Sequence, residues 1–541
     1  MNIRRTALPV IALTAAVLAA GQAAASVQED GASSDPHALP LGPAGLTETR
    51  TTRTIQPGVT LTTIVRGVAD PDSVWTVEIA IPSGEGSPDP DAPPAALKDE
   101  AAANATADQL RAAGLEPRVE PVPTPRVADA GGGVLGYRVR VGAVPTKAEA
   151  DALRTQVLAT GLGGSSIFTG WDGEPDDVSG STGPWHVQVL TVDPRRFGGT
   201  LAASYGPDLE RRETTSALAA LTGATAAVNA GFFVLDPAAG APGDPAGVAA
   251  YDGRLVSEPV AGRPALTVRH DARGTEVVRL RWRGFAGSLP LDGLNRVPGL
   301  IRNCGGRGDT PTDLPLHDVT CTDPGELVAF DAAYGAATPA GPGTEVVLDR
   351  KDRVVAIRDT RGGAVPTGGR TVQATGDLVD DLRAAAQPGA TLAVRAWLVD
   401  DHGDRVDVGR QTTVVNGGPE LVRDGRLHAT PGADGMAPAG NPSFYYGWAH
   451  KRNPRTLAGV DAAGRTVLVT ADGRSEASLG LGIAETAAVA KALGLRDALN
   501  LDGGGSTTMV VEGSVVNAPS DAAGERPVGD ALIVLAEHNQ K

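Results

Sequence analysis

Two segments in the first third of the chain alternate apolar and polar side chains as half-buried strands do. Each is followed by an alanine-rich stretch with helical spacing and then by another strand, so the chain repeats a β-α-β unit. The predicted strands are 75–83 and 137–146, and the predicted helices are 97–113 and 147–160. Gly114 and Gly161 end the two helices, because glycine readily takes the left-handed conformation of a helix terminus.

The rest of the chain consists mainly of short apolar strands joined by glycine-containing turns. The pattern predicts strands at 184–193 and 226–234 and helices at 214–221 and 479–493. Hairpin signals outnumber strand-helix alternation over 181–541. We therefore expect an α+β fold with mixed or antiparallel sheets and a few covering helices.

The apolar segment 498–511 is interrupted by Asn500, Asp502, three consecutive glycines and a run of hydroxyl side chains. Consecutive glycines are costly in backbone entropy, so they suggest positive φ angles or a ligand close to the main chain. Their amides could hold an anion. The alternative is a glycine-rich hairpin whose aspartate only accepts turn hydrogen bonds.

Composition narrows the classes of protein. The 541 residues are 41% hydrophobic and 21% charged, which indicates a soluble globular protein of two or three domains. The net charge of −16 argues against nucleic acid or an anionic membrane as the main partner. Arginine greatly outnumbers lysine along the whole chain, so a single arginine is weak evidence for a phosphate site.

The N-terminal segment predicts export. Arg4 and Arg5 precede the apolar run 7–20, and small residues follow before Ser26, as in a secretory signal peptide over 1–25. We expect a secreted, extracellular protein with no stable membrane insertion after signal cleavage. Association of this protein with the cell wall stays open. An uncleaved anchor is the alternative, although the run is short for a bilayer. Residues 26–46 read as a linker.

The two cysteines, Cys304 and Cys321, lie in a loop-like region. Export favours a disulfide between them, which would stabilise the fold by roughly 3 kcal/mol in the chain-entropy model. Free thiols are the alternative. The histidines lack the spacing of a metal site, so we expect no catalytic zinc and no cofactor. Calcium held by Asp-rich loops stays an open alternative.

The segment from Tyr137 to Ala143, with the helix start at 146–153, resembles the SPOR domain signature. The resemblance implies a small ferredoxin-like βαββαβ module over 71–175 that binds glycan strands of peptidoglycan. A spacer or regulatory insert without a ligand is the alternative.

Several motifs occur in the order found in the phosphodiester glycosidase family, the family of the uncovering enzyme, and the chain resembles it over 181–541. The motifs are Asn-Ala-Gly-Phe-Phe at 229–233, Tyr-Asp-Gly-Arg at 251–254, Asn-Gly-Gly-Pro at 416–419, Pro-Arg-Thr at 454–456, Asp-Gly-Arg at 472–474 and Leu-Asn-Leu-Asp-Gly-Gly-Gly-Ser at 499–506. A Gly-Val-Thr strand within 47–70 fits the first strand of this domain. The SPOR-like module would then be an insertion.

The resemblance implies a hydrolase that releases a sugar from a sugar 1-phosphodiester. Phosphate is a good leaving group, so the site needs mainly a positioned carboxylate and hydrogen-bond donors that hold the phosphate. Asp502 is the lead carboxylate and Arg455 the candidate phosphate clamp, and we expect both to share one cavity with Asn229. Asp472 and Glu485 are candidates for a second catalytic carboxylate. A turn residue and a solvated helix residue are the respective alternatives.

The remaining motif residues are expected to contact the sugar phosphate or cell-wall glycan. They are Asn229, Gly231, Phe232, Asn416, Gly417, Gly418, Thr456, Asn500, Gly503, Gly504, Gly505, Ser506 and Thr507. Two other functions stay open. One is a non-catalytic cell-wall glycan-binding protein, and the other is a glycosidase that acts on non-phosphorylated polysaccharide.

Overall fold

A computed structural model describes residues 28–29, 38–81, 93–174, 180–237, 240–260, 262–301, 310–311, 321–438 and 440–537. The predicted signal peptide and Cys304 lie outside these residues. Cys321 is fully buried, and its pairing with Cys304 stays a prediction. No helix in the described ranges combines the length and the apolar character that a membrane crossing requires.

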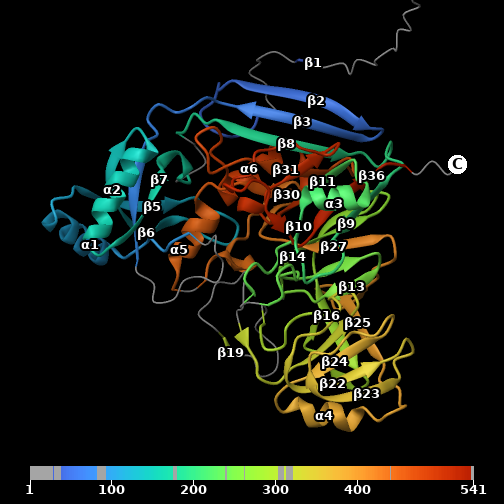
Figure 1. Ribbon diagram of the computed structural model, residues 1–541. Coiled ribbons are helices and arrows are strands. Elements are labelled where there is room, and N and C mark those ends of the chain that lie inside the picture. The colour runs from blue at the N-terminus through green and yellow to red at the C-terminus, as the bar shows by residue number, and fades with distance from the viewer. Residues whose placement is uncertain are drawn as a thin grey trace, which may run out of the picture.

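A nine-stranded antiparallel sheet, called the central sheet below, reaches from the upper edge of the molecule, at β2 and β3, into its middle, at β30 and β31 (Figure 1). From one edge to the other its strands are β1 (Gln28–Glu29), β2 (Glu48–Gln56), β3 (Val59–Arg66), β8 (Trp185–Val192), β31 (Thr466–Ala471), β30 (Arg455–Asp461), β32 (Leu495–Asn500), β28 (Glu420–Arg423) and β29 (Arg426–Leu427). Helix α6 (Ile483–Ala492) packs on one face through Ile483, Ala487 and Val489, which join the cluster containing Leu457 and Val469.

A second sheet packs on the other face of the central sheet. Its order is β34 (Ser514–Val515), β33 (Met509–Val511), β11 (Ala226–Asn229), β36 (Ala531–Leu535) and β9 (Thr200–Ser204). Val228 and Met509 from this sheet share a core with Ala458, Leu468 and Leu499 of the central sheet. Helix α3 (Thr215–Thr222) and the β10 (Glu213–Thr214) and β35 (Pro527–Val528) pair adjoin it.

Three further sheets follow from the centre of the molecule downward in Figure 1; the first shares a core with the two sheets above through Leu266 and Val415, and the second and third form the arm at the bottom. The first contains β13 (Arg254–Ser257), β12 (Ala249–Tyr251), β27 (Thr412–Asn416), β14 (Pro264–Arg269) and β15 (Thr275–Arg279). The second contains β17 (Leu289–Pro290), β16 (Arg281–Ala286), β25 (Val394–Val399) and β26 (Arg405–Val406). The third contains β18 (Gly293–Leu294), β21 (Leu327–Asp331), β24 (Arg370–Ala374), β22 (Gly341–Leu348) and β23 (Val354–Arg361), next to helix α4 (Leu378–Ala385).

Short elements complete the list. They are η1 (Thr169–Trp171), β19 (Thr310–Pro311), β20 (Cys321–Thr322), η3 (Gly432–Met436), α5 (Pro442–Tyr445), η4 (Tyr446–His450) and η5 (Gly504–Ser506). Among the described strands, β18 and β21 pair in parallel and the other pairings are antiparallel. The sheet-rich α+β class expected from sequence is therefore confirmed.

The small unit lies between β3 and β8 in the chain. It runs in the order β4 (Trp75–Ala80), α1 (Glu100–Ala112), β5 (Pro117–Thr124), β6 (Gly133–Val144), α2 (Lys147–Ala159) and β7 (Gly163–Phe168), with sheet order β5-β6-β4-β7. β3 and β8 are antiparallel neighbours, with Arg66 opposite Trp185. The chain therefore leaves the central sheet after β3 and re-enters it beside the same strand.

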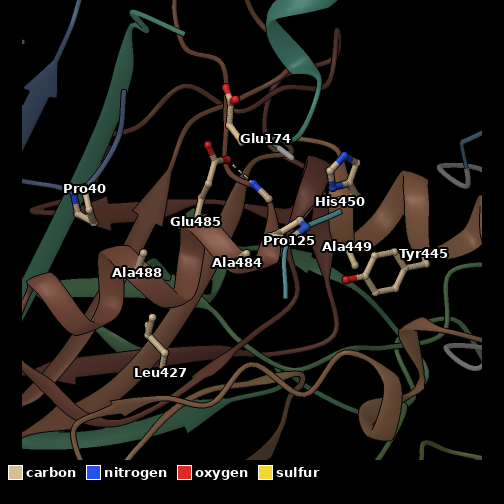
Figure 2. A pocket seen from close by; sticks show the side chains of 11 residues that line it. Pro40, Pro125, Glu174, Leu427, Tyr445, Ala449, His450, Ala484, Glu485 and Ala488 are labelled. Atoms are coloured by element: carbon tan, nitrogen blue, oxygen red, sulfur yellow. Dashed lines mark hydrogen bonds between the residues drawn. The ribbon is translucent and has the colours of Figure 1, made fainter. Parts of the chain in front are cut away.

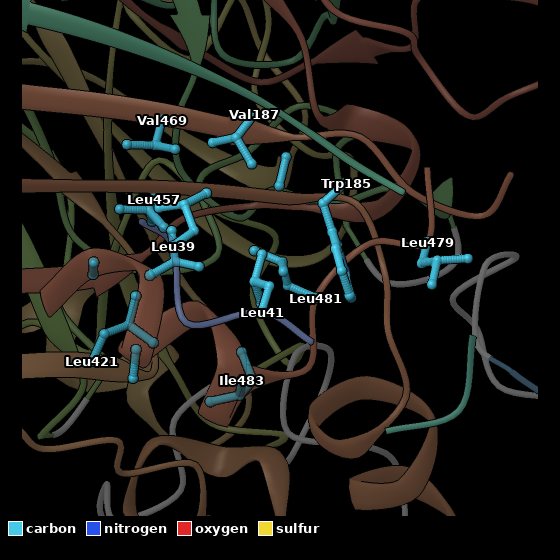
Figure 3. Packing of buried hydrophobic residues seen from close by; sticks show 14 of the residues in the cluster. Leu39, Leu41, Trp185, Val187, Leu421, Leu457, Val469, Leu479, Leu481 and Ile483 are labelled. Atoms are coloured by element: carbon cyan, nitrogen blue, oxygen red, sulfur yellow. The ribbon is translucent and has the colours of Figure 1, made fainter. Parts of the chain in front are cut away.

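Part of the predicted linker belongs to the core instead. Leu39 is 1% exposed and Leu41 is fully buried, and both pack with Trp185 and Leu481 in the cluster beneath α6 (Figure 3). Helix α6 also begins later than the predicted 479, because Gly480 has a φ of +89° and Gly482 is the N-cap. The Glu485 carboxylate accepts a hydrogen bond from the Gly482 amide at 2.8 Å and so fixes this start.

A buried ion network joins the small unit to the large domain, which comprises the described residues before 71 and after 175. The Arg140 guanidinium, 2% exposed, contacts Glu78 at 2.9 Å and Asp172 at 2.7 Å. From the large domain, the Tyr446 hydroxyl and the Lys451 ammonium each donate to Glu78 at 2.7 Å. Burial alone would raise the pKa of Glu78, but Lys451 and Arg140 outweigh it and lower the pKa to about 2.

This network uses one face of the four-stranded sheet. Val77 and Ile79 of β4 pack against α1 and α2 on the opposite face. Because side chains alternate along a strand, Glu78 points to the face that α1 and α2 leave open. The large domain covers Glu78 at that face.

Candidate functional site

Asn229 holds together the ends of three strands. Its side chain is fully buried at the end of β11. Its Nδ2 donates to the Asp502 carbonyl at 2.6 Å, and its Oδ1 accepts from the Thr456 hydroxyl at 2.8 Å and the Thr508 amide at 3.0 Å. Both the donor and the acceptor functions of the amide are therefore used. Asn229 acts as a clamp that fixes where Asp502 emerges.

Asp502 opens the glycine turn. Its amide donates to the Ala230 carbonyl at 2.9 Å, and the residue is half-buried, whereas Gly504 to Thr508 are buried. Gly504 has a φ of +59°, which favours glycine, and the Arg474 Nη2 lies 3.3 Å from the place where a Cβ would sit. The positive φ expected from the glycine run is present at this position.

Gly505 is required for a different reason. A Cβ there would lie 2.0 Å from the Arg526 Nη2 and 2.3 Å from the Asp521 Oδ1. These two side chains form a bidentate pair, with Arg526 Nε to Asp521 Oδ2 and Arg526 Nη2 to Asp521 Oδ1 both at 2.8 Å. The space beside Gly505 is thus filled by an ion pair of the protein itself.

Arg474, which the sequence does not single out, lies at the glycine turn. It is half-buried, its φ is +56°, and its Nε donates to the Asn453 Oδ1 at 3.1 Å. A residue other than glycine at a positive φ carries backbone strain, and such strain is common at functional sites. The Asp-Gly-Arg motif contains Arg474, but the motif alone does not show that its arginine lies over the glycine turn.

The Asn-Ala-Gly-Phe-Phe motif is fixed by two polar residues from other strands. The Gly231 amide donates to the Asp530 Oδ1 at 2.7 Å, and the Tyr251 hydroxyl donates to the other carboxylate oxygen at 2.7 Å. The Phe232 amide donates to the Asn416 Oδ1 at 2.9 Å. Burial raises the pKa of Asp530. Asp530 was not a predicted site residue, although it is a lone acid directly before an apolar strand.

Arg455 does not join Asp502 and Asn229. It is 3% exposed, and its guanidinium donates to the carbonyls of Leu481 at 2.8 Å and Trp448 at 2.7 Å. Successive residues of a strand face opposite sides of the sheet, so Thr456 reaches Asn229 while Arg455 points to the α6 side. Burial, followed by the neighbouring Arg474, lowers the pKa of Arg455 to about 9. Its contacts are those of a buried structural residue.

Glu485 also lies on the α6 side. Its carboxylate caps α6 and pairs with the buried Arg452 at 2.7 Å, which also contacts Glu174 at 2.9 Å. The two carboxylates line a cavity of about 240 Å³ between the small unit and the large domain, together with His450 and Tyr445 (Figure 2). Burial lowers the pKa of His450 to about 4. Within the described ranges, Glu485 makes its hydrogen bonds with Arg452 and the Gly482 amide, and none with the glycine turn.

Asp472 reaches the glycine turn through one intermediate. Its Oδ1 accepts from Asn517 Nδ2 at 3.2 Å and from the Ala518 amide at 2.9 Å, and the Asn517 Nδ2 also donates to the Thr507 carbonyl at 3.0 Å. Asp472 is 6% exposed, and burial raises its pKa. Its contacts fix the segment after the glycines.

The other predicted contact residues are buried backbone partners. Asn500 Nδ2 donates to the Gly418 carbonyl at 3.0 Å, and the Gly418 amide donates to the Asn500 carbonyl at 2.7 Å. A Cβ on Gly417 would lie 2.6 Å from Leu499. Ser506 is 1% exposed. Within the described ranges, no group of three or more His, Cys, Asp or Glu side chains is arranged to hold a metal ion.

The site therefore combines a half-buried aspartate, a strained arginine and an ordered turn. Hydrogen bonds bring together Asn229, Thr456 and Thr507 at this turn. The bond from the Asp502 amide to the Ala230 carbonyl places the Asn-Ala-Gly-Phe-Phe motif beside it. Asp502 can accept a proton or stabilise positive charge, and Arg474 can bind an anion. Arg455 and Glu485 lie on the other side of the sheet.

Comparisons with known proteins found a family match in each part of the chain. Residues 343–535 match the phosphodiester glycosidase family, and residues 95–167 match the SPOR domain. A 67-residue stretch is 42% identical to mouse N-acetylglucosamine-1-phosphodiester alpha-N-acetylglucosaminidase, and covers 12% of this chain and 13% of that protein. An 89-residue stretch is 37% identical to the SPbeta prophage-derived uncharacterized protein YomE of Bacillus subtilis, and covers 16% of this chain and 14% of that protein.

Two solved structures are similar over most of the chain. One is a Burkholderia pseudomallei K96243 protein described as exported, with 36% identity, a TM-score of 0.80, and coverage of 94% of this chain and 100% of that one. The other is a hypothetical protein from Synechocystis, with 16% identity, a TM-score of 0.51, and coverage of 94% and 80%. The second likeness concerns the fold alone.

Proposed function

Because the chain carries a phosphodiester glycosidase domain and a SPOR domain, we propose that it is an exported hydrolase that cleaves sugar 1-phosphodiesters of cell-wall or extracellular glycan. The observation that carries the proposal is the clamp by which Asn229 fixes Asp502, with Arg474 over the adjoining Gly504. These residues belong to three separate sequence motifs of the resemblance. Their convergence supports a reaction centre.

In the proposed reaction, Asp502 takes a proton from the attacking water, whose oxygen bonds to the sugar C1. The bond between C1 and the phosphate oxygen breaks, and its electrons leave with the phosphate monoester. Arg474 binds the phosphate, the role that sequence gave to Arg455. Asp472 acts as a positioning residue through Asn517 rather than as a second acid, since a phosphate leaves without protonation.

The SPOR unit gives the proposal its location. We assign it as a ferredoxin-like module that brings the enzyme to wall glycan, as the relation to peptidoglycan-binding SPOR domains suggests. The large domain covers Glu78 on the face of its sheet opposite α1 and α2, so glycan contact would come from the helices or the sheet edges. Binding of the full chain to insoluble peptidoglycan, compared with a variant lacking 71–175, tests this assignment.

The catalytic test compares synthetic sugar 1-phosphodiesters with matched simple glycosides. We expect turnover of the phosphodiesters only, and a loss of about 10²–10⁴ in kcat for Asp502→Asn with an unchanged circular dichroism spectrum. Arg474→Gln should raise KM or lower kcat, whereas Arg273→Gln, in the exposed turn between β14 and β15, should behave as the parent.

Three results would refute the proposal. Release from neither panel would favour the glycan-binding protein, and release from simple glycosides alone would favour a conventional glycosidase. Full activity of Asp502→Asn would remove its assigned role.

A further inference from the structure

A basic and aromatic face lies on the four-stranded sheet of the arm, apart from the glycine turn. Arg283 of β16 is directly opposite Trp397 of β25, and Phe285 is directly opposite Arg395. Residues directly opposite in an antiparallel pair point to the same face. Arginines and aromatic rings therefore alternate in both directions across this face.

The two rings form a shared platform. Phe285 and Trp397 stack with their centroids 5.9 Å apart and their planes at 25°. The Arg405 guanidinium lies 5.8 Å from the centroid of Trp397. The opposite face of the same strands is apolar, with Ala286 and Leu398 buried in the core. One face of the sheet therefore packs on the core, and the rings lie on the opposite face.

Within the described ranges, the guanidinium groups of Arg281, Arg283 and Arg395 make no hydrogen bond or ion pair, and all three are exposed. This is unusual in a chain of net charge −16 in which many arginines are paired with acids. Exposed, unpaired cations beside flat rings suit a ligand that carries both anionic groups and apolar ring faces.

A cavity of about 480 Å³ continues from this face toward the neighbouring sheet. Arg395, Trp397 and Arg405 line it, together with Arg254 and Arg370. The acid at its wall, Asp331, is neutralised by Arg254, whose Nε lies 3.0 Å from the Asp331 Oδ2. Arg370 is also paired, with Asp352 at 3.4 Å, so Arg395 and Arg405 supply the positive charge of the cavity, which continues to the platform.

We propose that this face and the cavity bind a linear polyanionic glycan, with sugar rings stacked on Phe285 and Trp397 and phosphate groups held by Arg283, Arg395 and Arg405. The assignment rests on the proposed function and deepens it, because it makes the substrate a sugar-phosphate polymer that the enzyme grips away from the reaction centre. β16 and β25 lie in the lower arm of Figure 1, well away from helices α1 and α2.

The test measures binding by the full chain in the Asp502→Asn background, which prevents hydrolysis. The probe is a synthetic oligomer of N-acetylglucosamine joined by 1-phosphodiester links, compared with a chitin oligosaccharide of equal length. The double variant Arg283→Gln/Arg395→Gln should weaken binding of the phosphodiester oligomer by about tenfold or more and reduce its salt dependence. Arg273→Gln is the matched control and should bind normally.

Trp397→Ala should also weaken binding, and the arginine variants keep the test valid if it folds poorly. Unchanged binding by the double variant, equal affinity for chitin, or tighter binding of single-stranded DNA would each overturn the proposal. With native Asp502, the double variant should hydrolyse a monomeric phosphodiester at the parent rate. If the parent hydrolyses nothing, the proposed function fails while the binding result still stands or falls separately.

Discussion

Replacing Asn229 by aspartate changes the clamp at Asp502 by one group. The ionised side chain still accepts hydrogen bonds from Thr456 and Thr508. It has no donor for the Asp502 carbonyl, to which the Asn229 Nδ2 donates at 2.6 Å in the parent protein. One buried carbonyl loses its partner, at about 1–3 kcal/mol, and a negative charge is buried beside it.

The charge penalty has a ceiling, because the new carboxyl can take up a proton instead. Its unfolded pKa is about 3.9, so protonation at pH 7 costs about 3 pH units of about 1.36 kcal/mol each, or about 4 kcal/mol. We therefore expect Asn229→Asp to lower the free energy of unfolding by about 2–4 kcal/mol at pH 7. Once protonated, the new carboxyl would donate to the carbonyl as the Asn229 amide does.

The stability difference between variant and parent should depend on pH, in a direction set by the pKa shift of the new carboxyl. The folded pKa of the new carboxyl is raised, so its stability deficit is smallest below the unfolded pKa and grows as pH rises through the folded pKa. Denaturant unfolding of parent and variant at pH 4, 5.5 and 7 checks this, since the difference cancels the other titrating groups. Asn229→Ala should show a loss that does not vary with pH. A pH-independent deficit for Asn229→Asp, or one below about 1 kcal/mol at pH 7, would refute the reasoning.

Two further predictions concern the junction between the two domains. Arg140→Met leaves Glu78 and Asp172 buried without their shared cation, so we expect a loss of about 3–5 kcal/mol in denaturant unfolding, and a loss under about 1 kcal/mol would contradict the network. Burial lowers the pKa of His450 in the folded protein to about 4, so as pH falls the unfolded state takes up a proton before the folded state does. The free energy of unfolding should therefore decrease between pH 6.5 and pH 4, by up to about 3 kcal/mol. His450→Gln should flatten this part of the stability curve, and an unchanged slope would contradict the assignment.

The sequence predicted the features that depend on local patterning. Alternation located β4 and β8, and alanine spacing with terminal glycines located α1 and α2 to within a few residues. It failed where the deciding contact is distant in the chain. Leu39 and Leu41 stand alone among prolines and glycines, and only the central sheet and α6 make them core residues.

At the candidate site, too, the sequence predicts local features but not contacts between distant parts of the chain. The glycine turn and Asn229 were identified because their residue types are unusual for their positions, and both lie at the candidate site. The sequence favours Arg455 over Arg474, because a motif does not specify the face of the sheet to which a side chain points. A one-residue step separates Thr456, which reaches Asn229, from Arg455, which faces α6. The arm that carries Trp397 had no sequence signal of its own beyond short strands.

The ion network around Arg140 and Glu78 has a mechanical consequence. A module tethered by a loose segment would let the large domain move through a volume set by the length of the tether. Here the insertion leaves and re-enters between neighbouring strands, and its sheet is held against the large domain by Tyr446 and Lys451. Any surface that the small module grips would therefore also set the height and tilt at which Asp502 meets a polymer.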